Sequence, residues 1–231
     1  MKNFILGVIG LGAVVGCTGP RMVAPAEVAK GSQVLEVADR SSMTGALANE
    51  SFKLGTYEVA DVDRDWNKSS GFSVPGYSKD QTTTGYSYAL KGSGGTWKGS
   101  CASKADKQGV GSASTNVSWG KTSITCECKN ADVSASIVLN GDSPDSSKGL
   151  AGELISGGTK YKVSPVNDTD KTNLTSGPAG FRFDGDAGSI GAVETLRPGR
   201  VWINERLPEA DRPSVACLSA GLMLYAPPSD H

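Results

Sequence analysis

The segment Ser214-Val-Ala-Cys-Leu-Ser-Ala-Gly-Leu-Met-Leu-Tyr225 decides the fold. It carries no charge, and its apolar residues would lie on every side of a helix. Pro213 suits the first turn, Asp211 is in position to cap it, and Pro227-Pro228 ends it. A helix without a polar face is either buried on all sides or placed in lipid. Its length of roughly 18 Å is short of the roughly 30 Å hydrocarbon layer, so we place it inside the protein.

The sequence before this segment alternates between apolar and polar residues. Ile124, Cys126 and Cys128 share one face of a stretch whose other face carries Thr125 and Glu127. This period of two is typical of strands with one buried face. We expect about twelve strands, at Gln33–Ala38, Phe52–Asp61, Thr84–Lys91, Gly95–Cys101, Val110–Trp119, Lys121–Lys129, Asp132–Asn140, Leu150–Ile155, Lys160–Val166, Gly180–Asp184, Ser189–Leu196 and Arg200–Glu205.

Many strands and one apolar helix favour a mainly β fold, a closed antiparallel barrel of about 12 strands around a buried hydrophobic C-terminal helix. Closure pairs the strand edges, and a barrel of this size is wide enough to hold a helix. The sequence Arg197-Pro198-Gly199-Arg200 is expected to close the last hairpin, because Pro and Gly supply the dihedral angles of a tight turn. The alternative is a β-sandwich with the helix packed on one face.

The end of the chain resembles the tubby-like, scramblase-related barrels, whose last element is a hydrophobic helix in the lumen. The resemblance rests on Gly191-Ala192-Val193-Glu194, Val201-Trp202-Ile203 and Val215–Tyr225, which follow a strand-rich body. It would cover nearly all of the chain after the N-terminal segment. The phosphoinositide-binding residues of the eukaryotic relatives match no motif here, so the resemblance implies the fold and not that activity.

The N-terminus has the features of an export signal. Met1-Lys2-Asn3 is a short basic region, and Phe4–Val15 is an apolar stretch too short to span a bilayer. Val14-Val15-Gly16-Cys17 then resembles the lipobox of bacterial lipoproteins, in which the cysteine becomes the acylated N-terminus. We therefore expect a signal peptide at 1–16, a lipidated tether at 17–32 and a single barrel domain at 33–231. Thr18, where the enterobacterial sorting rule would need Asp for inner-membrane retention, favours the outer membrane.

The composition excludes several function classes. The chain is 38% hydrophobic, or roughly 48% when its 30 Gly are added and its 6 Tyr removed, which is normal for a soluble globular protein, and its formal net charge is -1. A nucleic-acid binder needs a concentrated basic surface, so no nucleic-acid partner is predicted. The one histidine is the last residue, His231, which removes the commonest catalytic and metal-binding sets. We predict no catalytic residue, no cofactor and no metal.

Four cysteines remain after Cys17, an even number that favours disulfide bonds in an exported protein. Cys101 ends one expected strand, while Cys126 and Cys128 share a face of another, so we expect a bridge from Cys101 to one of them, with Cys126 slightly preferred. Cys217 either pairs with the remaining strand cysteine or stays a buried thiol.

Three function classes remain. The favoured one is a non-enzymatic, outer-membrane lipoprotein that acts as a binding or structural module of the cell envelope, bound to lipid through acylated Cys17 and to an unidentified envelope protein or ligand. The second is a lipocalin-like carrier of a small apolar ligand, which would lose its cavity if the helix fills the lumen. The third is a glycan hydrolase that uses two carboxylates, for which Glu153, Glu194 and Glu205 are present.

Overall fold

The computed structural model describes residues 19–40, 50–65, 68–112, 115–131, 133–142, 149–172 and 177–225. The segment expected to be a signal peptide, residues 1–16, and Cys17 lie outside these residues. The described chain has thirteen strands, β1 (Ser32–Ala38), β2 (Phe52–Leu54), β3 (Tyr57–Arg64), β4 (Lys68–Val74), β5 (Tyr77–Gly92), β6 (Gly95–Ser112), β7 (Thr115–Asn130), β8 (Val133–Gly141), β9 (Ala151–Ser156), β10 (Thr159–Val166), β11 (Gly180–Gly185), β12 (Gly188–Glu194) and β13 (Arg200–Asn204). Its helices are α1 (Ala26–Ala29), a single 3-10 turn (Glu209–Asp211) and α2 (Arg212–Leu224).

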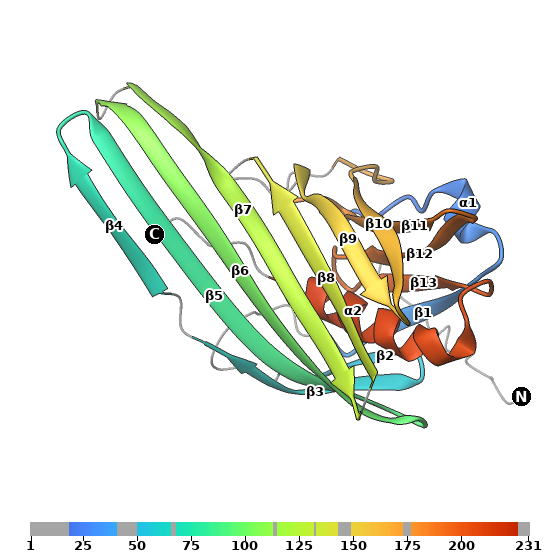
Figure 1. Ribbon diagram of the computed structural model, residues 1–231. Coiled ribbons are helices and arrows are strands. Elements are labelled where there is room, and N and C mark those ends of the chain that lie inside the picture. Colours follow the sequence, from blue (N-terminus) through green and yellow to red (C-terminus); the bar gives the residue numbers. More distant parts are fainter. Residues whose placement is uncertain are drawn as a thin grey trace, which may run out of the picture.

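Twelve of these strands close into an antiparallel barrel (Figure 1). Strand β3 pairs with β2 on one side and with β5 on the other, which joins the two ends of the sheet. Strand β4 pairs with β5 beyond this junction and stands outside the ring. The prediction of a closed barrel is confirmed, and the β-sandwich alternative is wrong because the two ends of the sheet meet.

Helix α2 lies in the barrel interior and packs against β5, β6, β7, β8, β12 and β13. Every residue from Ser214 to Leu224 is buried, as the absence of a polar face predicts. Asp211 occupies the N-cap position, but its side chain forms no capping hydrogen bond, so the expected cap is wrong. The carboxylate of Asp211 instead accepts a hydrogen bond from Ser156, and Ser214 donates to the Asp211 carbonyl.

The tyrosines of β5 fix the helix to the barrel wall. The Tyr88 hydroxyl donates to the carbonyl of Cys217 at 2.8 Å, and the Tyr86 hydroxyl donates to the carbonyl of Gly221 at 2.8 Å. A Cβ atom at Gly221 would lie only 2.7 Å from the Tyr88 hydroxyl oxygen and 2.8 Å from the Cys101 sulfur. The glycine inside this helix is therefore what lets the helix approach the wall so closely.

Two arginines hold the C-terminal end of α2. Arg64 donates to the carbonyl of Leu224 at 2.8 Å, and Arg40 donates to the carbonyl of Met223. Burial, with a further contribution from Arg197, lowers the pKa of Arg40 to about 10, so its guanidinium group is still charged at neutral pH. Cations at this end complement the partial negative charge of the last carbonyl groups.

Two disulfide bonds connect these elements. Cys101 and Cys126 face each other across β6 and β7 and form the bridge that the sequence slightly preferred. Cys217 of α2 is bonded to Cys128 of β7, which decides the alternative left open for Cys217. Because all four side chains are in disulfides, none of them is a thiol that could bind a metal.

The segment expected to be a tether packs on the barrel from residue 21 onward. Met22 is buried and pairs with Thr169 in an isolated bridge. Arg21 forms an ion pair with the buried carboxylate of Glu194 at 3.0 Å, and α1 packs on β12 and β13. These residues belong to the folded domain rather than to a free linker.

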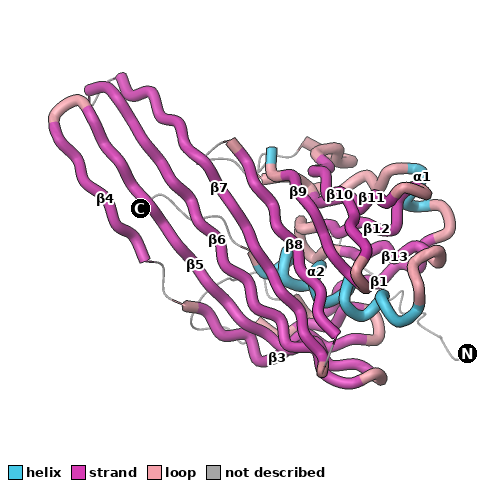
Figure 2. The backbone as a smooth tube through the Cα atoms, viewed as in Figure 1, coloured by secondary structure: helices cyan, strands magenta, loops and turns pink. Residues whose placement is uncertain are grey.

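The middle strands differ most from the prediction. Strands β5, β6 and β7 have 16, 18 and 16 residues, against 8, 7 and 9 in the expected strands, and they continue well beyond the barrel (Figure 2). The expected strand Val110–Trp119 is wrong, because these residues belong to the end of β6 and the start of β7. The expected strand Phe52–Asp61 is divided by a tight turn at Gly55 into β2 and β3.

Candidate functional site

Four strands form a sheet that projects from the barrel. We call this part the blade. It consists of strand β4 and of the distal parts of the next three strands, Tyr77–Thr83 of β5, Lys104–Val110 of β6 and Val117–Ser123 of β7. Strand β8 pairs with β7 only from Thr122 onward, so the blade extends past the barrel wall. Its tip lies at the end of the molecule opposite to α1 (Figure 1).

The register places large side chains in rows across the blade. Each row takes one residue from β7, β6, β5 and β4 in turn, and successive rows are about 7 Å apart. The row nearest the tip is Val117, Val110, Tyr77 and Val74; the next are Trp119, Gln108, Lys79 and Phe72; then Lys121, Asp106, Gln81 and Ser70; and finally Ser123, Lys104, Thr83 and Lys68. We call this surface the outer blade face, because it continues the outside of the barrel.

The other face of the blade, which continues the barrel interior, has mostly small side chains, with Asp80 and Lys107 as exceptions. Its rows are Ser118, Gly109, Ser78 and Ser73; Gly120, Lys107, Asp80 and Gly71; and Thr122, Ala105, Thr82 and Ser69. The side chains of the tip rows therefore differ in kind between the two faces. Apolar and aromatic groups lie on one, and hydroxyl groups and glycines lie on the other.

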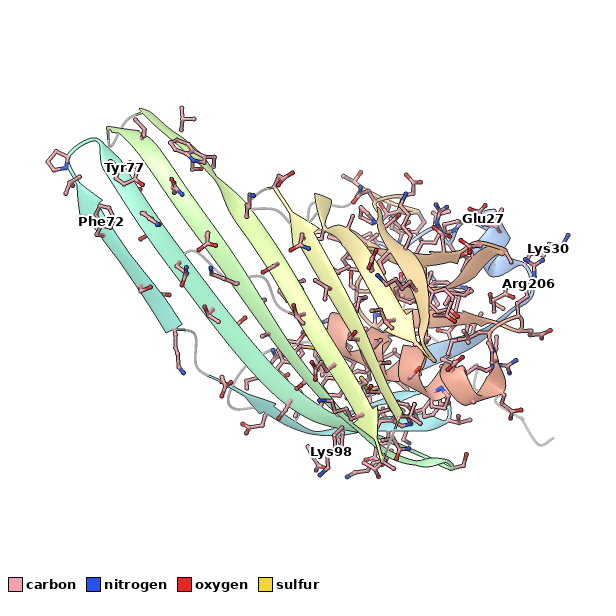
Figure 3. The ribbon with its side chains drawn as sticks, viewed as in Figure 1. Glu27, Lys30, Phe72, Tyr77, Lys98 and Arg206 are labelled. Carbon is pink, nitrogen blue, oxygen red and sulfur yellow. A yellow bond between two sulfur atoms is a disulfide. The ribbon has the colours of Figure 1, made fainter. Side chains whose placement is uncertain are left out.

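The apolar side chains of the outer blade face are exposed to an unusual degree. Val117 is 65% exposed, Phe72 55% and Trp119 46%. Phe72 and Tyr77, both labelled near the tip in Figure 3, have ring centroids 5.7 Å apart. Contiguous exposed apolar surface rimmed by polar groups marks interaction sites in soluble proteins. The outer blade face is thus the strongest candidate for a binding surface in the described chain.

The blade is also basic. It carries five lysines, Lys68, Lys79, Lys104, Lys107 and Lys121, against Asp80 and Asp106, a net charge of +3 in a chain whose formal net charge is -1. This asymmetry concentrates positive potential at one end of the molecule. An approaching anionic partner would be attracted to the blade rather than to the barrel.

A shallow depression of about 370 Å³ lies on the outer blade face, lined by Lys79, Gln81, Lys104, Asp106, Gln108, Trp119, Gly120 and Lys121. Gln81 donates to the Asp106 carboxylate at 2.7 Å, and Lys104 forms an ion pair with the same group at 3.2 Å. The hydrogen bond from Gln81, followed by the contribution of Lys104, lowers the pKa of Asp106. The depression therefore combines an ionised carboxylate, two amides, three ammonium groups and one indole ring.

The structure separates the three glutamates considered for a hydrolase. Glu194 has a fully buried side chain, bound by Arg21 at 3.0 Å and by Arg200 at 2.8 Å. Burial alone would raise the pKa of Glu194, but the hydrogen bonds from Arg21, Arg200 and the Met22 amide outweigh it and lower the pKa. Glu153 is exposed and pairs with Lys160 on the next strand, and Glu205 is exposed after β13. The carboxylate of Glu194 thus has a structural role, because its ion pairs and hydrogen bonds hold residues 21 and 22 on the barrel.

The lumen of the described barrel is occupied by the side chains of α2. Leu218 and Leu222 of α2 and Ile137 and Leu154 of the wall belong to one buried cluster. A carrier of the lipocalin type would need this space for its ligand. The barrel fold itself is compatible with either a binding module or a carrier.

Sequence reasoning missed the blade although one signal was present. Val74-Pro75-Gly76-Tyr77 contains the Pro-Gly pair of a tight turn, and Gly76 has a φ of +85° in the structure. The turn joins β4 to β5, so the pair marks a hairpin. The strands beside it are rich in Ser, Thr and Lys, which hid their alternation from a search for buried faces.

Comparison of the chain with protein-family models, with curated proteins and with solved structures found no significant match. Within the described residues, none of the helices is long and apolar enough to cross a membrane.

Proposed function

We propose that the protein is a lipid-anchored, non-enzymatic binding module of the bacterial cell envelope, and that the outer blade face is its binding surface. The observation that carries the proposal is the row of exposed apolar side chains across four strands, next to a row that contains Trp119 and Phe72. Keeping such groups in water is unfavourable, and proteins retain them where a partner covers them.

The barrel acts as a rigid support for this surface. Its interior is filled by α2, and two disulfide bonds and the Tyr86 and Tyr88 hydrogen bonds hold that helix to β5, β6 and β7. The same three strands continue without interruption into the blade. A binding surface built on continuous strands is positioned more precisely than one built on loops.

The lipobox resemblance supplies the anchor. Acylated Cys17 would hold the chain on the outer membrane without a transmembrane helix, because each buried methylene of the acyl chains contributes roughly 0.8 kcal/mol. The folded part of the chain begins only a few residues later, since Met22 is already buried on the barrel. With α1 at the opposite end from the blade tip, the anchored protein would present its blade away from the membrane (Figure 1).

We further infer that the domain is a distant relative of the tubby-like barrels. A closed barrel with a hydrophobic C-terminal helix in its interior is the arrangement that the sequence resemblance implies. The blade has no place in that resemblance, so the relationship would concern the scaffold and not the binding surface.

Site-specific photo-crosslinking in living cells tests the binding surface. A photoreactive residue at Val117 on the blade should give adducts with envelope components, whereas one at Val138, a 40% exposed residue on the barrel wall, should give none. Equal adducts at both positions, or none at Val117, would contradict the proposal.

The anchor is tested separately by replacing Cys17 with Ser. The variant should leave the detergent-extractable membrane fraction, because it lacks the acyl chains. Unchanged membrane association of the variant would disprove lipidation at this position.

A further inference from the structure

The depression on the outer blade face contains two lysines, Lys79 and Lys121, that share the nearby charge of Asp106 but form no ion pair with a described residue. Lys79 and Lys121 are exposed and form no ion pair with any described residue, whereas Lys104 is bound to Asp106. Lys121 lies two residues after Trp119 on β7, and Lys79 lies in the same row as Trp119, two strands away. The two cations therefore flank the indole ring on different sides.

The side chains that lie between Lys79 and Lys121 can form hydrogen bonds, and neighbouring residues hold them in place. Gln108 stands directly between Trp119 and Lys79 in the register, and its side-chain oxygen accepts from Tyr77 at 3.5 Å. Asp106 stands between Lys121 and Gln81 and is held by Gln81 and Lys104. Amide and carboxylate groups held by neighbours are suited to hydroxyl groups, which both donate and accept.

We propose that this depression binds an acidic polysaccharide, a glycan that carries carboxylate groups on its sugar rings. The proposal rests on the function proposed above and names the partner of that surface. A sugar ring packs its C–H groups on Trp119, its hydroxyl groups bond to Gln108 and Asp106, and its carboxylates pair with Lys79 and Lys121. A volume of about 370 Å³ is at the lower end of ligand sites, which fits one or two sugar units of a longer chain that runs across the strands.

The charge of the blade favours this class of ligand over a neutral glycan. The net charge of +3 on the blade attracts a polyanion over a distance of about 8 to 10 Å at moderate salt. A lipid bilayer fits the blade less well, because the opposite face carries Ser73, Ser78 and Ser118 and the backbone edge of β4 has no strand partner among the described residues. Such groups are unfavourable in hydrocarbon.

Binding of the purified full-length chain to polygalacturonate tests the proposal, with the methyl ester of the same polymer as the neutral control. We expect binding to the acid form, at least about tenfold weaker binding to the ester, and weakening as salt rises. Trp119→Ala and the double variant Lys79→Gln/Lys121→Gln should each weaken binding about tenfold or more. Lys98→Gln is the matched control, because Lys98 is an exposed lysine on the same face of β6, at the end of that strand away from the blade (Figure 3). It should leave binding unchanged.

Equal binding of the acid polymer and its ester would overturn the proposal, and so would an equal effect of the Lys98 variant and the double lysine variant. If polygalacturonate does not bind but Val117 still gives crosslinks in cells, the binding surface stands and its partner is not an acidic glycan. Binding to phosphatidylglycerol vesicles is measured as the last comparison. Binding to the vesicles but not to polygalacturonate would mean that the outer blade face binds lipid rather than an acidic glycan.

Discussion

Strands β5, β6 and β7 each have one half in the barrel and one half in the blade, and large and small side chains alternate in both halves. The large side chains lie on opposite faces of the sheet in the two halves. In the barrel the large side chains point inward, as Tyr86, Tyr88 and Ile124 do, and α2 covers them. In the blade the large apolar side chains, such as Val110 and Trp119, point outward, and the inward positions hold mostly small residues, with Asp80 and Lys107 as the charged exceptions. The strands continue through this change, so it is a change of sequence and not of backbone. The alternation of side chains thus predicts a strand, but it does not say which face is buried. The buried face is the one on which another element, here α2, packs.

The largest contrast between the two halves is expected from an added charge. Leu218→Asp places an unpaired carboxylate in the filled lumen, which costs several kcal/mol, about as much as a typical domain's whole stability, so the domain should unfold. Val117→Asp makes the same change in charge on the blade and should shift stability by less than about 0.5 kcal/mol. Thermal unfolding followed by circular dichroism distinguishes the two variants. A normal melting curve for the Leu218 variant would mean that α2 is not in the core.

The disulfide bonds should rank next in effect, and they should differ from each other. Cys128–Cys217 spans 89 residues and Cys101–Cys126 spans 25. The loop-entropy relation gives about 4 to 5 kcal/mol for the first and about 3 to 4 kcal/mol for the second. Denaturant unfolding of the variants Cys128→Ala/Cys217→Ala and Cys101→Ala/Cys126→Ala measures both. A larger loss from the second pair would show that the short bridge, next to Gly221, contributes more than loop closure.

A smaller, pH-dependent effect is expected at Glu194. Its pKa is lowered in the folded state from an ordinary value of 4.5, so its contribution is present above that value and is lost as the pH falls through the lowered pKa. At pH 7, Glu194→Gln should cost about 3 kcal/mol, because it leaves Arg21 and Arg200 without their carboxylate. The difference from the native chain should shrink toward pH 3. The control Glu153→Gln, at an exposed pair, should cost less than about 1 kcal/mol at any of these pH values.

The sequence predicted the barrel because one feature, the apolar helix, required something to surround it. The segment Ser214–Tyr225 has no polar side, and among folds rich in strands a closed barrel can bury such a helix. The hairpin at Arg197–Arg200 followed from its turn residues, and the Cys101–Cys126 bridge was the slightly preferred of two pairings that the strand pattern left open. These features depend on burial or on turn geometry, which the sequence records directly.

The blade could not be predicted in the same way because it buries very little. Residues Lys68–Thr83 are mostly Ser, Thr, Gly and charged residues, and Phe72, Val74 and Tyr77 are too few to mark a buried face, so a search for buried faces finds no strand there. The ten residues Val110–Trp119 are short enough to be read as one strand, and only the structure divides them between β6 and β7. The depression likewise assembles residues from β5, β6 and β7 that no motif connects in the sequence.

Hydrogen–deuterium exchange of the full-length chain, with and without acidic envelope glycan, tests the central claim most directly, because β5, β6 and β7 each report on both halves. Without ligand, amides around Tyr86, Cys101 and Cys126 should exchange slowly, and amides around Lys79, Gln108 and Trp119 faster. With ligand, only the blade amides should gain protection. Protection confined to the barrel, or none on the blade, would contradict the account.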